Sequence, residues 1–464
     1  MKTTSKKAPL TPEYTQELKF AAIAGKPVVV DFKGGEITSD GGLCLFSEAD
    51  KVLGLSSALS SVLTEWRAQS KVVHDMKSLL AQRMFAIGAG YADCNDHKTL
   101  RRDPALKMAC DKAPIDSPDL ASQPTLSRFE NHVSKRDLVR LAIAQGRCMI
   151  EKLPSATRRI ILDVDATDDA AHGAQQLVMF NGYYAHRCYC PLLLHMTPED
   201  GKQRPLGALL RAGNAGPCDG LGFMVRRAVA ELRRRFPDVQ IILRADGAYG
   251  CQEVLGLCER LKIDFILGLK GNARLHELCS AAQTRAAVRH GFVDDRVFAQ
   301  FSYQAKVWSQ AQRVIVKAQA QANEVKCRYV VTNLPCNSFD EAAQAEDMYG
   351  QYCGRGEQEN RIKELKLDLE SGRTSCSSYK ANQFRLILHL AACMVWNVVQ
   401  QGLRKVAHGS DWADFQVKSL RERLIKLGAR VVQSSRRVVM HASSSYPHAH
   451  IWHLLYAHWR PSLC

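Results

Sequence analysis

The strongest constraint on the fold of this chain is a pair of apolar runs that both end in acidic residues. RRIILDVDAT at 158–167 and VQIILRAD at 239–246 are short and rich in β-branched residues, so both are predicted to be buried strands. Between them, GLGFMVRRAVAELRRRF at 220–236 carries apolar residues at helical spacing. This pattern predicts an α/β domain in which two central strands end in carboxylates.

The neighbouring segments extend the same pattern. Two more strands are predicted at 175–196 and 204–211, with the Asp-Gly pair at 200–201 as the hairpin turn between them. A helix at 251–262 and a strand at 264–270 complete the series. The order strand-strand-strand-helix-strand-helix-strand is that of a ribonuclease-H-like mixed sheet with helices on its faces. We therefore predict an α/β fold with a ribonuclease-H-like core.

The excess of basic residues indicates a polyanionic partner. The formal net charge is +16, and neutralising phosphates releases counterions, which favours binding to nucleic acid. Charge alone does not separate DNA from RNA or from a membrane surface. No run approaches the roughly 18 uninterrupted apolar residues that a membrane span needs, and the N-terminus lacks the apolar stretch of a secretory signal. We therefore predict a cytoplasmic protein with no membrane partner.

The cysteines give a different expectation. The chain has 16 of them, scattered along its length, and no Cys-x2-Cys pair recurs. This spacing favours buried, reduced thiols over a structural zinc site.

The rest of the chain is organised around the predicted core. We expect the core to comprise 156–290 and 340–410, interrupted by a β-rich insertion at 291–339, where apolar and polar residues alternate. Residues 1–155 are predicted to be mainly helical and basic, which suits DNA binding, although a helical cap packed on the core explains any single helix equally well. The basic residues of this region include Arg67, Lys71, Lys77 and Arg83. Residues 411–464 form a basic C-terminal region.

Candidate metal-binding acids stand at the ends of the two central strands. Asp163 and Asp165 are two residues apart, so their side chains share one face of the first strand. Asp246 ends the second strand, and strand ends are where the catalytic groups of open α/β sheets emerge. A single acid at a strand end is more often structural. A metal site would need a further acid from another part of the chain.

That further acid is predicted on a helix near residue 360. Tyr352, Arg355, Glu359 and Lys366 lie on one narrow stripe if each residue turns the helix by about 100°. Such a stripe is either a solvated face with ion pairs or a face that follows a phosphate backbone with one acid aimed at a metal. Glycines on both sides of Arg355 weaken the helix at this end of the stripe.

These residues carry a resemblance to a known group of enzymes. The spacing Tyr-x2-Arg-x3-Glu-x6-Lys resembles the motif of the IS4-type DDE transposases that contains their catalytic glutamate. Asp165-Ala166-Thr167 is similar to the Asp-x-Thr around their first aspartate, and LRADGAYG followed by DFILGLKGNARL resembles the segment around their second. LDVDATDDAAHG, FNGYYAHRCYCPLLLH and RGEQENRIKELK further resemble the IS1380 family of bacterial insertion-sequence transposases. The resemblance extends from about residue 36 to about residue 440.

The resemblance implies a specific site. Asp165, Asp246 and Glu359 would be the catalytic acids and would hold two Mg²⁺ ions, with Mn²⁺ as a substitute. Asp163 is the rival for the first position, and the Asp-x-Thr match favours Asp165. The residues expected to contact DNA are Tyr352, Arg355, Lys366, Trp308, Arg436 and Arg437. Trp308 is considered as a stacking platform for an unpaired base, with a core tryptophan as the alternative.

The implied function is cut-and-paste DNA transposition. The enzyme would cleave strands at transposon ends and transfer them into target DNA, with terminal inverted-repeat DNA and target DNA as partners. The region 1–155 would then bind the ends, and 411–464 would contact DNA, mediate dimerisation or both. The resemblance also implies a homodimer in the DNA complex and a bacterial, nucleoid-associated location. Two alternatives stay open: a ribonuclease-H-like nuclease without strand transfer, and a domesticated DNA-binding protein.

Overall fold

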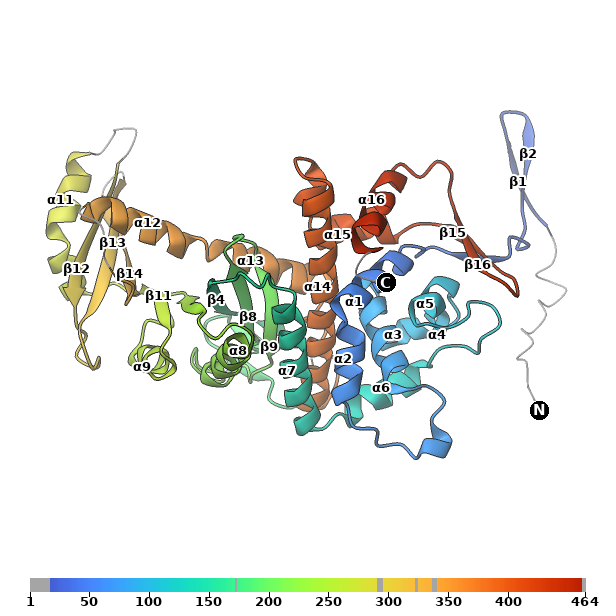
Figure 1. Ribbon diagram of the computed structural model, residues 1–464, viewed down its shortest axis with the longest axis horizontal. Helices are drawn as coiled ribbons and strands as arrows, with labels where there is room; N and C mark the ends of the chain where they lie inside the picture. The colour runs from blue at the N-terminus through green and yellow to red at the C-terminus, as the bar shows by residue number, and fades with distance from the viewer. Residues whose placement is uncertain (1–16, 172, 290–294, 322–323, 336–339, 461–464) are drawn as a thin grey trace. The chain divides into compact units, whose positions relative to one another are not determined.

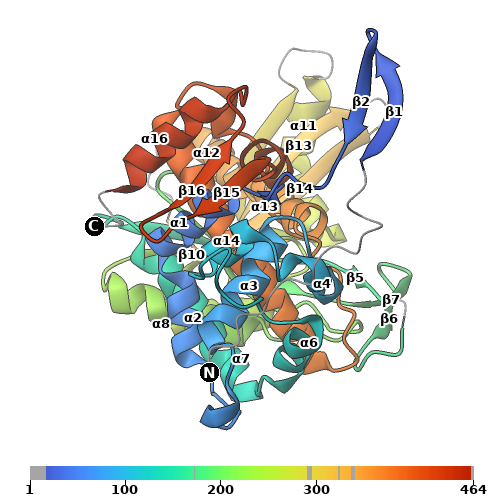
Figure 2. The ribbon, with the colours of Figure 1, turned by 90° about the vertical axis from the view of Figure 1, so that its right-hand side faces the viewer.

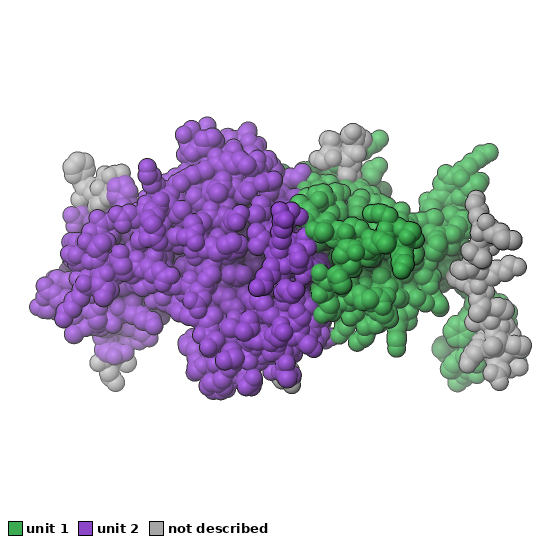
Figure 3. Space-filling model, turned by 90° about the horizontal axis from the view of Figure 1, so that it is seen from below, with its two compact units in different colours: residues 1–132, 391–464 green, residues 133–390 purple. Residues whose placement is uncertain are grey.

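The computed structural model describes residues 17–171, 173–289, 295–321, 324–335 and 340–460. Contacts divide the chain into two compact units, one of residues 1–132 and 391–464 and one of 133–390 (Figure 3). The N-terminal helices and the C-terminal region, which the sequence predicted as separate parts, therefore belong to one unit. Small parts of the predicted N-terminal region, of the insertion and of the C-terminal region lie outside the described residues.

The second unit is built on an eight-stranded mixed sheet (Figure 1). Its order is β12-β13-β14-β11-β10-β4-β8-β9. The strands are β4 (Arg159–Ala166), β8 (Leu192–Pro198), β9 (Arg204–Leu209), β10 (Gln240–Ala245), β11 (Asp264–Leu269), β12 (Arg296–Tyr303), β13 (Gln312–Gln321) and β14 (Glu324–Thr332). Strands β4, β10 and β11 run parallel, and every other pair is antiparallel. The predicted mixed α/β class is confirmed.

The predicted succession of elements is present, with one error. Strands β4, β8 and β9 come first, and helix α8 (Leu221–Arg235), β10, helix α9 (Gln252–Leu261) and β11 follow. Gly201 adopts φ +69° in the turn between β8 and β9, a conformation that glycine tolerates best. The single strand predicted at 175–196 is wrong. The segment folds as β6 (Met179–Asn181), β7 (His186–Tyr189) and β8, and the first two form a small sheet with β5 (Asp169–Ala170).

The region predicted as a β-rich insertion is part of the main sheet. Strands β12, β13 and β14 form an antiparallel meander, and β14 pairs with β11 from Ile266↔Thr332 to Leu269↔Tyr329. The alternating pattern identified the strands correctly. It did not reveal the long-range pairing, because the period of a strand says nothing about its neighbour.

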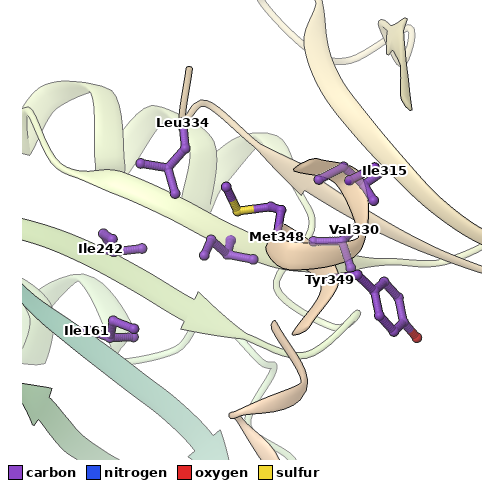
Figure 4. Close-up of a cluster of buried hydrophobic side chains, with 9 residues drawn as sticks. Ile161, Ile242, Ile315, Val330, Leu334, Met348 and Tyr349 are labelled. Atoms are coloured by element: carbon purple, nitrogen blue, oxygen red, sulfur yellow. The ribbon is translucent and has the colours of Figure 1, made fainter. Parts of the chain in front are cut away.

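Helices cover the sheet of the second unit. They are α7 (Lys135–Glu151), α8, α9, α10 (Ala273–Leu278), α11 (Ser280–Val288), α12 (Glu341–Cys353), α13 (Gly356–Lys363), the π-helical turn η4 (Glu364–Asp368) and the start of α14 (Tyr379–Val406). Helix α12 packs on one face of the sheet. There Met348 and Tyr349 meet Ile161 of β4 and Ile242 of β10 in a buried cluster (Figure 4). The packing of this cluster positions α12 on the sheet.

The first unit is mainly helical, with two small sheets. Its elements are β1 (Leu18–Ile23), β2 (Lys26–Val30), β3 (Glu36–Thr38), α1 (Leu43–Leu53), α2 (Leu55–Val62), η2 (Gln69–Lys71), α3 (Met76–Gly88), η3 (Cys94–Asp96), α4 (His97–Leu100), α5 (Pro104–Ala109), α6 (Gln123–His132), the end of α14, η5 (Asp411–Ala413), α15 (Val417–Leu420), η6 (Arg421–Ile425), β15 (Ala429–Gln433), β16 (Val438–Ala442) and α16 (Ala449–Trp459). Strands β1 and β2 form a hairpin, and β3 joins β15 and β16 in a three-stranded sheet (Figure 2).

One basic residue of this unit is excluded from DNA contact. Arg83 is fully buried and its Nε donates to Glu130 Oε1 at 2.7 Å. A second nitrogen of Arg83 donates to the carbonyl of Ala92 at 3.0 Å. Arg83 therefore ties α3 to α6, and its charge serves the core of the unit.

Helix α14 is the only one in the described part of the chain that passes a length and hydropathy test for a membrane span. In its most apolar window, 89% of the residues are buried inside the protein. A buried core helix of a globular protein passes the same test.

Candidate active site

The site lies where β4 and β10 end side by side. These parallel strands pair Ile161 with Ile242, then Asp163 with Arg244, and their last pair is Val164 with Ala245. Continued by one residue, this register puts Asp165 level with Asp246. Residues two apart share a face of a strand, so the face that α12 covers carries first an isoleucine pair, then an ion pair, and then two carboxylates.

The carboxyl group of Asp165 is held in a crowded, acidic place. Its side chain is 17% exposed, and burial together with the negative charge of Asp246 raises its pKa to about 6. The charge of Glu359 raises this pKa further, while Arg355 opposes the shift. Asp246 Oδ1 accepts the backbone N–H of Ala248 at 2.9 Å, which fixes the turn that follows β10. The three acids therefore act on one another electrostatically.

Arg355 joins two of these acids directly. One guanidinium nitrogen donates to Asp165 Oδ2 at 3.1 Å, and the other donates to Glu359 Oε1 at 3.2 Å. These contacts, with Asp246, hold the pKa of Arg355 above its usual range despite partial burial. The side chain of Glu359 is 53% exposed. One guanidinium thus faces three carboxylates, which leaves the cluster with excess negative charge.

The helix that carries Glu359 is interrupted at Gly354. Helix α12 ends at Cys353, and α13 starts at Gly356. An arginine nitrogen of Arg244 donates to the carbonyl of Gln351, and a Cβ atom at Gly354 would lie 2.6 Å from the same nitrogen. The glycine therefore gives Arg244 access to the end of α12.

Asp163 has a different environment from Asp165. It is fully buried, and both of its oxygens accept from Arg244, at 2.5 Å and 2.9 Å. Thr197 and Gln203 also donate to its Oδ2, each at 2.8 Å. All of this hydrogen bonding is internal to the protein, so the structure places Asp163 in a buried ion pair beneath the carboxylate cluster.

Gln358 is a positioning residue that the sequence reasoning missed. It is fully buried, and its Nε2 donates to the backbone carbonyl of Asp163 at 3.1 Å and to that of Leu193 at 3.3 Å. These bonds tie α13 to β4 and β8 one residue before Glu359. The sequence offered only a glutamine among the charged residues of one helix. Its role became clear once the structure showed its hydrogen-bond partners.

Lys366 lies beyond the end of the regular α-helix on which the sequence predicted it. It falls in the π-helical turn η4, where the angle per residue differs from that of an α-helix. Its Nζ donates to Asp168 Oδ1 at 2.8 Å and to Thr167 Oγ1 at 3.2 Å. The prediction of one continuous α-helical stripe from Tyr352 to Lys366 is therefore wrong.

The two aromatic candidates differ in their surroundings. Tyr352 is partly buried, and together with Arg355 and Arg328 it lines a hollow beside the acidic cluster. Its hydroxyl would lie 2.6 Å from a Cβ atom at Gly268, so the glycine leaves room for it. Trp308 is 5% exposed and packs edge-to-face against Tyr303 at 5.4 Å. The structure does not offer the ring of Trp308 to a base, because the space that a base needs is already filled.

The basic C-terminal candidates lie in the first unit. Arg436 and Arg437 are exposed in the turn between β15 and β16, where the backbone N–H of Ser434 donates to the carbonyl of Arg437 at 2.9 Å. Lys426 of the same region pairs with Asp40 at 2.7 Å. The positive charges of the tail are therefore divided between internal pairs and the exposed turn.

The acidic cluster fits a hard divalent cation. Carboxylate oxygens are the ligands that Mg²⁺ prefers, and such ions stabilise closely placed acids. Burial, with the charges of Asp246 and Glu359, raises the pKa of Asp165 despite the opposing charge of Arg355. The residues that would hold the ion are Asp165, Asp246 and Glu359.

The raised pKa of Asp165 predicts a pH effect on the stability of the metal-free protein. The folded state keeps this proton up to about pH 6, whereas the ordinary pKa of an aspartate side chain is 3.8. The contribution of Asp165 to stability is thus present below pH 4 and is lost as the pH rises through 6. Its size is about 3 kcal/mol, since each tenfold difference in proton affinity is worth about 1.4 kcal/mol.

Urea unfolding of the wild type and Asp165→Asn between about pH 4 and pH 7.5 measures this effect. The difference in unfolding free energy between the two proteins should change within this range, because the amide does not titrate. A constant difference would show that Asp165 ionises normally in the folded protein.

The fold and the site together define a class of protein. A mixed sheet that gathers two strand-end aspartates and a helical glutamate is the arrangement of a DDE-type enzyme. In agreement, the family model described as Transposase DDE domain group 1 matches residues 20–462. The chain belongs to this transposase family, whose members use divalent metal ions. No curated protein matches the chain.

Proposed function

We propose that this chain catalyses cut-and-paste DNA transposition, with Mg²⁺ as its metal. The observation that carries the proposal is that Arg355 bonds Asp165 and Glu359, and that the charge of Asp246 acts on both Asp165 and Arg355. The order of the five strands at one end of the sheet, β9-β8-β4-β10-β11, supports a ribonuclease-H-like core. The match of residues 20–462 to the DDE transposase family gives the reaction class. The narrower resemblance to the IS1380 family stays part of the proposal.

The residues of the site would divide the work as follows. The three acids would hold two divalent ions, which supply charge neutralisation at phosphorus and an activated nucleophile. Asp165 would have to be deprotonated for this, which its pKa of about 6 permits near neutral pH. Arg355 would move from the carboxylates to a phosphate of the bound strand, because the ions would take over its role of balancing charge. Gln358 would keep α13 fixed on β4 and β8 throughout.

Strand transfer is the reaction that tests the proposal. The protein is incubated in Mg²⁺ with a labelled duplex bearing the inverted repeat that flanks its gene and with a supercoiled target plasmid. We expect the labelled 3′ end to become covalently joined to the plasmid. A nick without joining would favour a nuclease that lacks strand transfer, and binding without any cleavage would favour a domesticated DNA-binding protein.

We further propose that the first unit binds the transposon ends and that the turn between β15 and β16 contacts phosphates. Replacing both Arg436 and Arg437 by alanine should lower the slope of log affinity against log salt by about 1.8, if each neutralises one phosphate. The measurement is binding of end DNA over a range of salt concentrations. The double lysine variant is the matched control and should keep the slope, because it keeps both charges. An unchanged slope in the alanine variant would remove this turn from the interface.

A homodimer in the DNA complex is part of the same proposal. Light scattering of the protein with and without end DNA measures the mass directly. We expect two chains per complex, and a single chain bound to two ends would contradict this.

A further inference from the structure

Three metal-ligating side chains from two separate segments meet beside the antiparallel meander of β12, β13 and β14, which extends the sheet beyond β11. They are His276 of α10, Cys279 at the junction of α10 with α11, and Cys327 of β14. Their donor atoms all lie within 4.8 Å of one another. Cys279 is 2% exposed, Cys327 is partly buried and His276 is exposed, so the group opens to solvent on its imidazole side. We propose that this group is a zinc site, separate from the carboxylate cluster.

The spacing of the two sulfurs carries the proposal. Cys279 Sγ and Cys327 Sγ lie 3.8 Å apart. Two thiolates on one tetrahedral zinc ion, each about 2.3 Å from the metal, stand about 3.8 Å apart, whereas a disulfide bond measures about 2.05 Å. The sulfurs are thus already at the separation that a shared ion requires.

The neighbouring polar groups support the same interpretation. Gln283 Nε2 donates to Cys279 Sγ at 3.1 Å, so an amide donor reaches one of the two sulfurs. The hydroxyl of Tyr329 lies 3.2 Å from Cys279 Sγ. Donors of this kind orient and stabilise a metal-bound thiolate.

The chemistry of the donors selects the metal. Two thiolates and an imidazole favour zinc, whereas the carboxylates of the catalytic cluster favour magnesium. Binding would release the protons of both thiols, and a water molecule or a side-chain oxygen would complete four-coordination. The ion would fasten the junction of α10 and α11 to β14, the strand that joins the meander to β11.

The test is the zinc content of the full-length protein, purified with zinc in the medium and desalted into Mg²⁺ buffer. Mass spectrometry of the metal should give about one zinc per chain. Replacement by Co²⁺ should give the charge-transfer absorption of thiolate-bound cobalt. Cys327→Ser and His276→Ala should each lose most of the zinc. Because His276 is exposed, its replacement should leave the core intact.

Cys218→Ser is the matched control. Cys218 Sγ lies 3.6 Å from Cys251 Sγ, but this second cysteine pair belongs to no three-residue metal-ligating group among the described residues. Its loss should leave the zinc content unchanged. Zinc well below one per chain in the wild type, or full zinc content in Cys327→Ser, overturns the proposal. So does isolation of the protein with a Cys279–Cys327 disulfide. None of these readouts depends on DNA cleavage, so the site can fail while the proposed transposase activity stands.

Discussion

Glu359→Ala and Asp246→Ala are expected to abolish nicking of transposon-end DNA while leaving the affinity for that DNA near the wild-type value. Each change removes a proposed metal ligand and leaves every basic residue in place. Loss of a residue that only supports a ligand typically costs 10–100-fold, so loss of a ligand itself should cost more than about 100-fold. The assay is nicking of a labelled duplex in Mg²⁺ or Mn²⁺, with binding measured in Ca²⁺.

Glu357→Ala is the matched control for Glu359→Ala. Both glutamates lie on α13 and are about half exposed, with side chains 44% and 53% exposed, but Glu357 pairs with Arg361 on the same helix. The control should nick at close to the wild-type rate. If Glu359→Ala nicks as fast as Glu357→Ala, Glu359 is an ordinary surface charge and the proposed catalytic site would have to be abandoned.

Asp163→Ala is expected to destabilise the protein by about 3–5 kcal/mol. The substitution leaves the guanidinium of Arg244, which is 4% exposed, without its buried counter-charge. It also removes the acceptor of Thr197 and Gln203. Urea unfolding at neutral pH measures the loss. Asp165→Asn, on the same face of the same strand, should be neutral or stabilising in the metal-free protein, because it relieves repulsion with Asp246.

A double variant distinguishes the effect of an unpaired buried charge from the effect of the lost hydrogen bonds. Asp163→Leu with Arg244→Met replaces both buried charges by apolar side chains of similar size, and such exchanges are often neutral or stabilising. The double variant should therefore be more stable than Asp163→Ala. Equal destabilisation of the two would mean that the hydrogen bonds of Thr197 and Gln203, rather than the ion pair, hold this part of the sheet.

The two aspartates of β4 show where sequence reasoning reached its limit. The alternation of a strand puts Asp163 and Asp165 on one face and cannot distinguish them. The register with β10 distinguishes them, because it sets Asp163 beside Arg244 and leaves Asp165 level with Asp246 at the open end of the sheet. From the sequence, only the resemblance to the Asp-x-Thr motif favoured Asp165 over Asp163 as the metal ligand.

The helix of Glu359 shows a second limit. Helical periodicity predicted that these side chains share one face of a regular helix. Arg244 instead bonds the end of α12, and the helix is interrupted at Gly354. Lys366 then lies in a π-helical turn and donates to Asp168. Both departures depend on contacts with residues more than 100 positions away, which local periodicity does not record.

The sequence by itself determined most elements of the sheet and the acids at the ends of its strands, because strand and helix periods and strand-end carboxylates are local features. The tertiary structure alone decided what lies opposite each of them. It joined β12–β14 to the main sheet, set Gln358 on the backbone of β4, and brought His276 and Cys279 to Cys327, 48 residues beyond Cys279. The scattered cysteines had predicted only buried, reduced thiols, since metal-ligand spacing in sequence reveals a site only when the ligands are close along the chain. Folding removes that requirement, because a sheet and the helices packed on it can place distant residues within a few ångströms of one another.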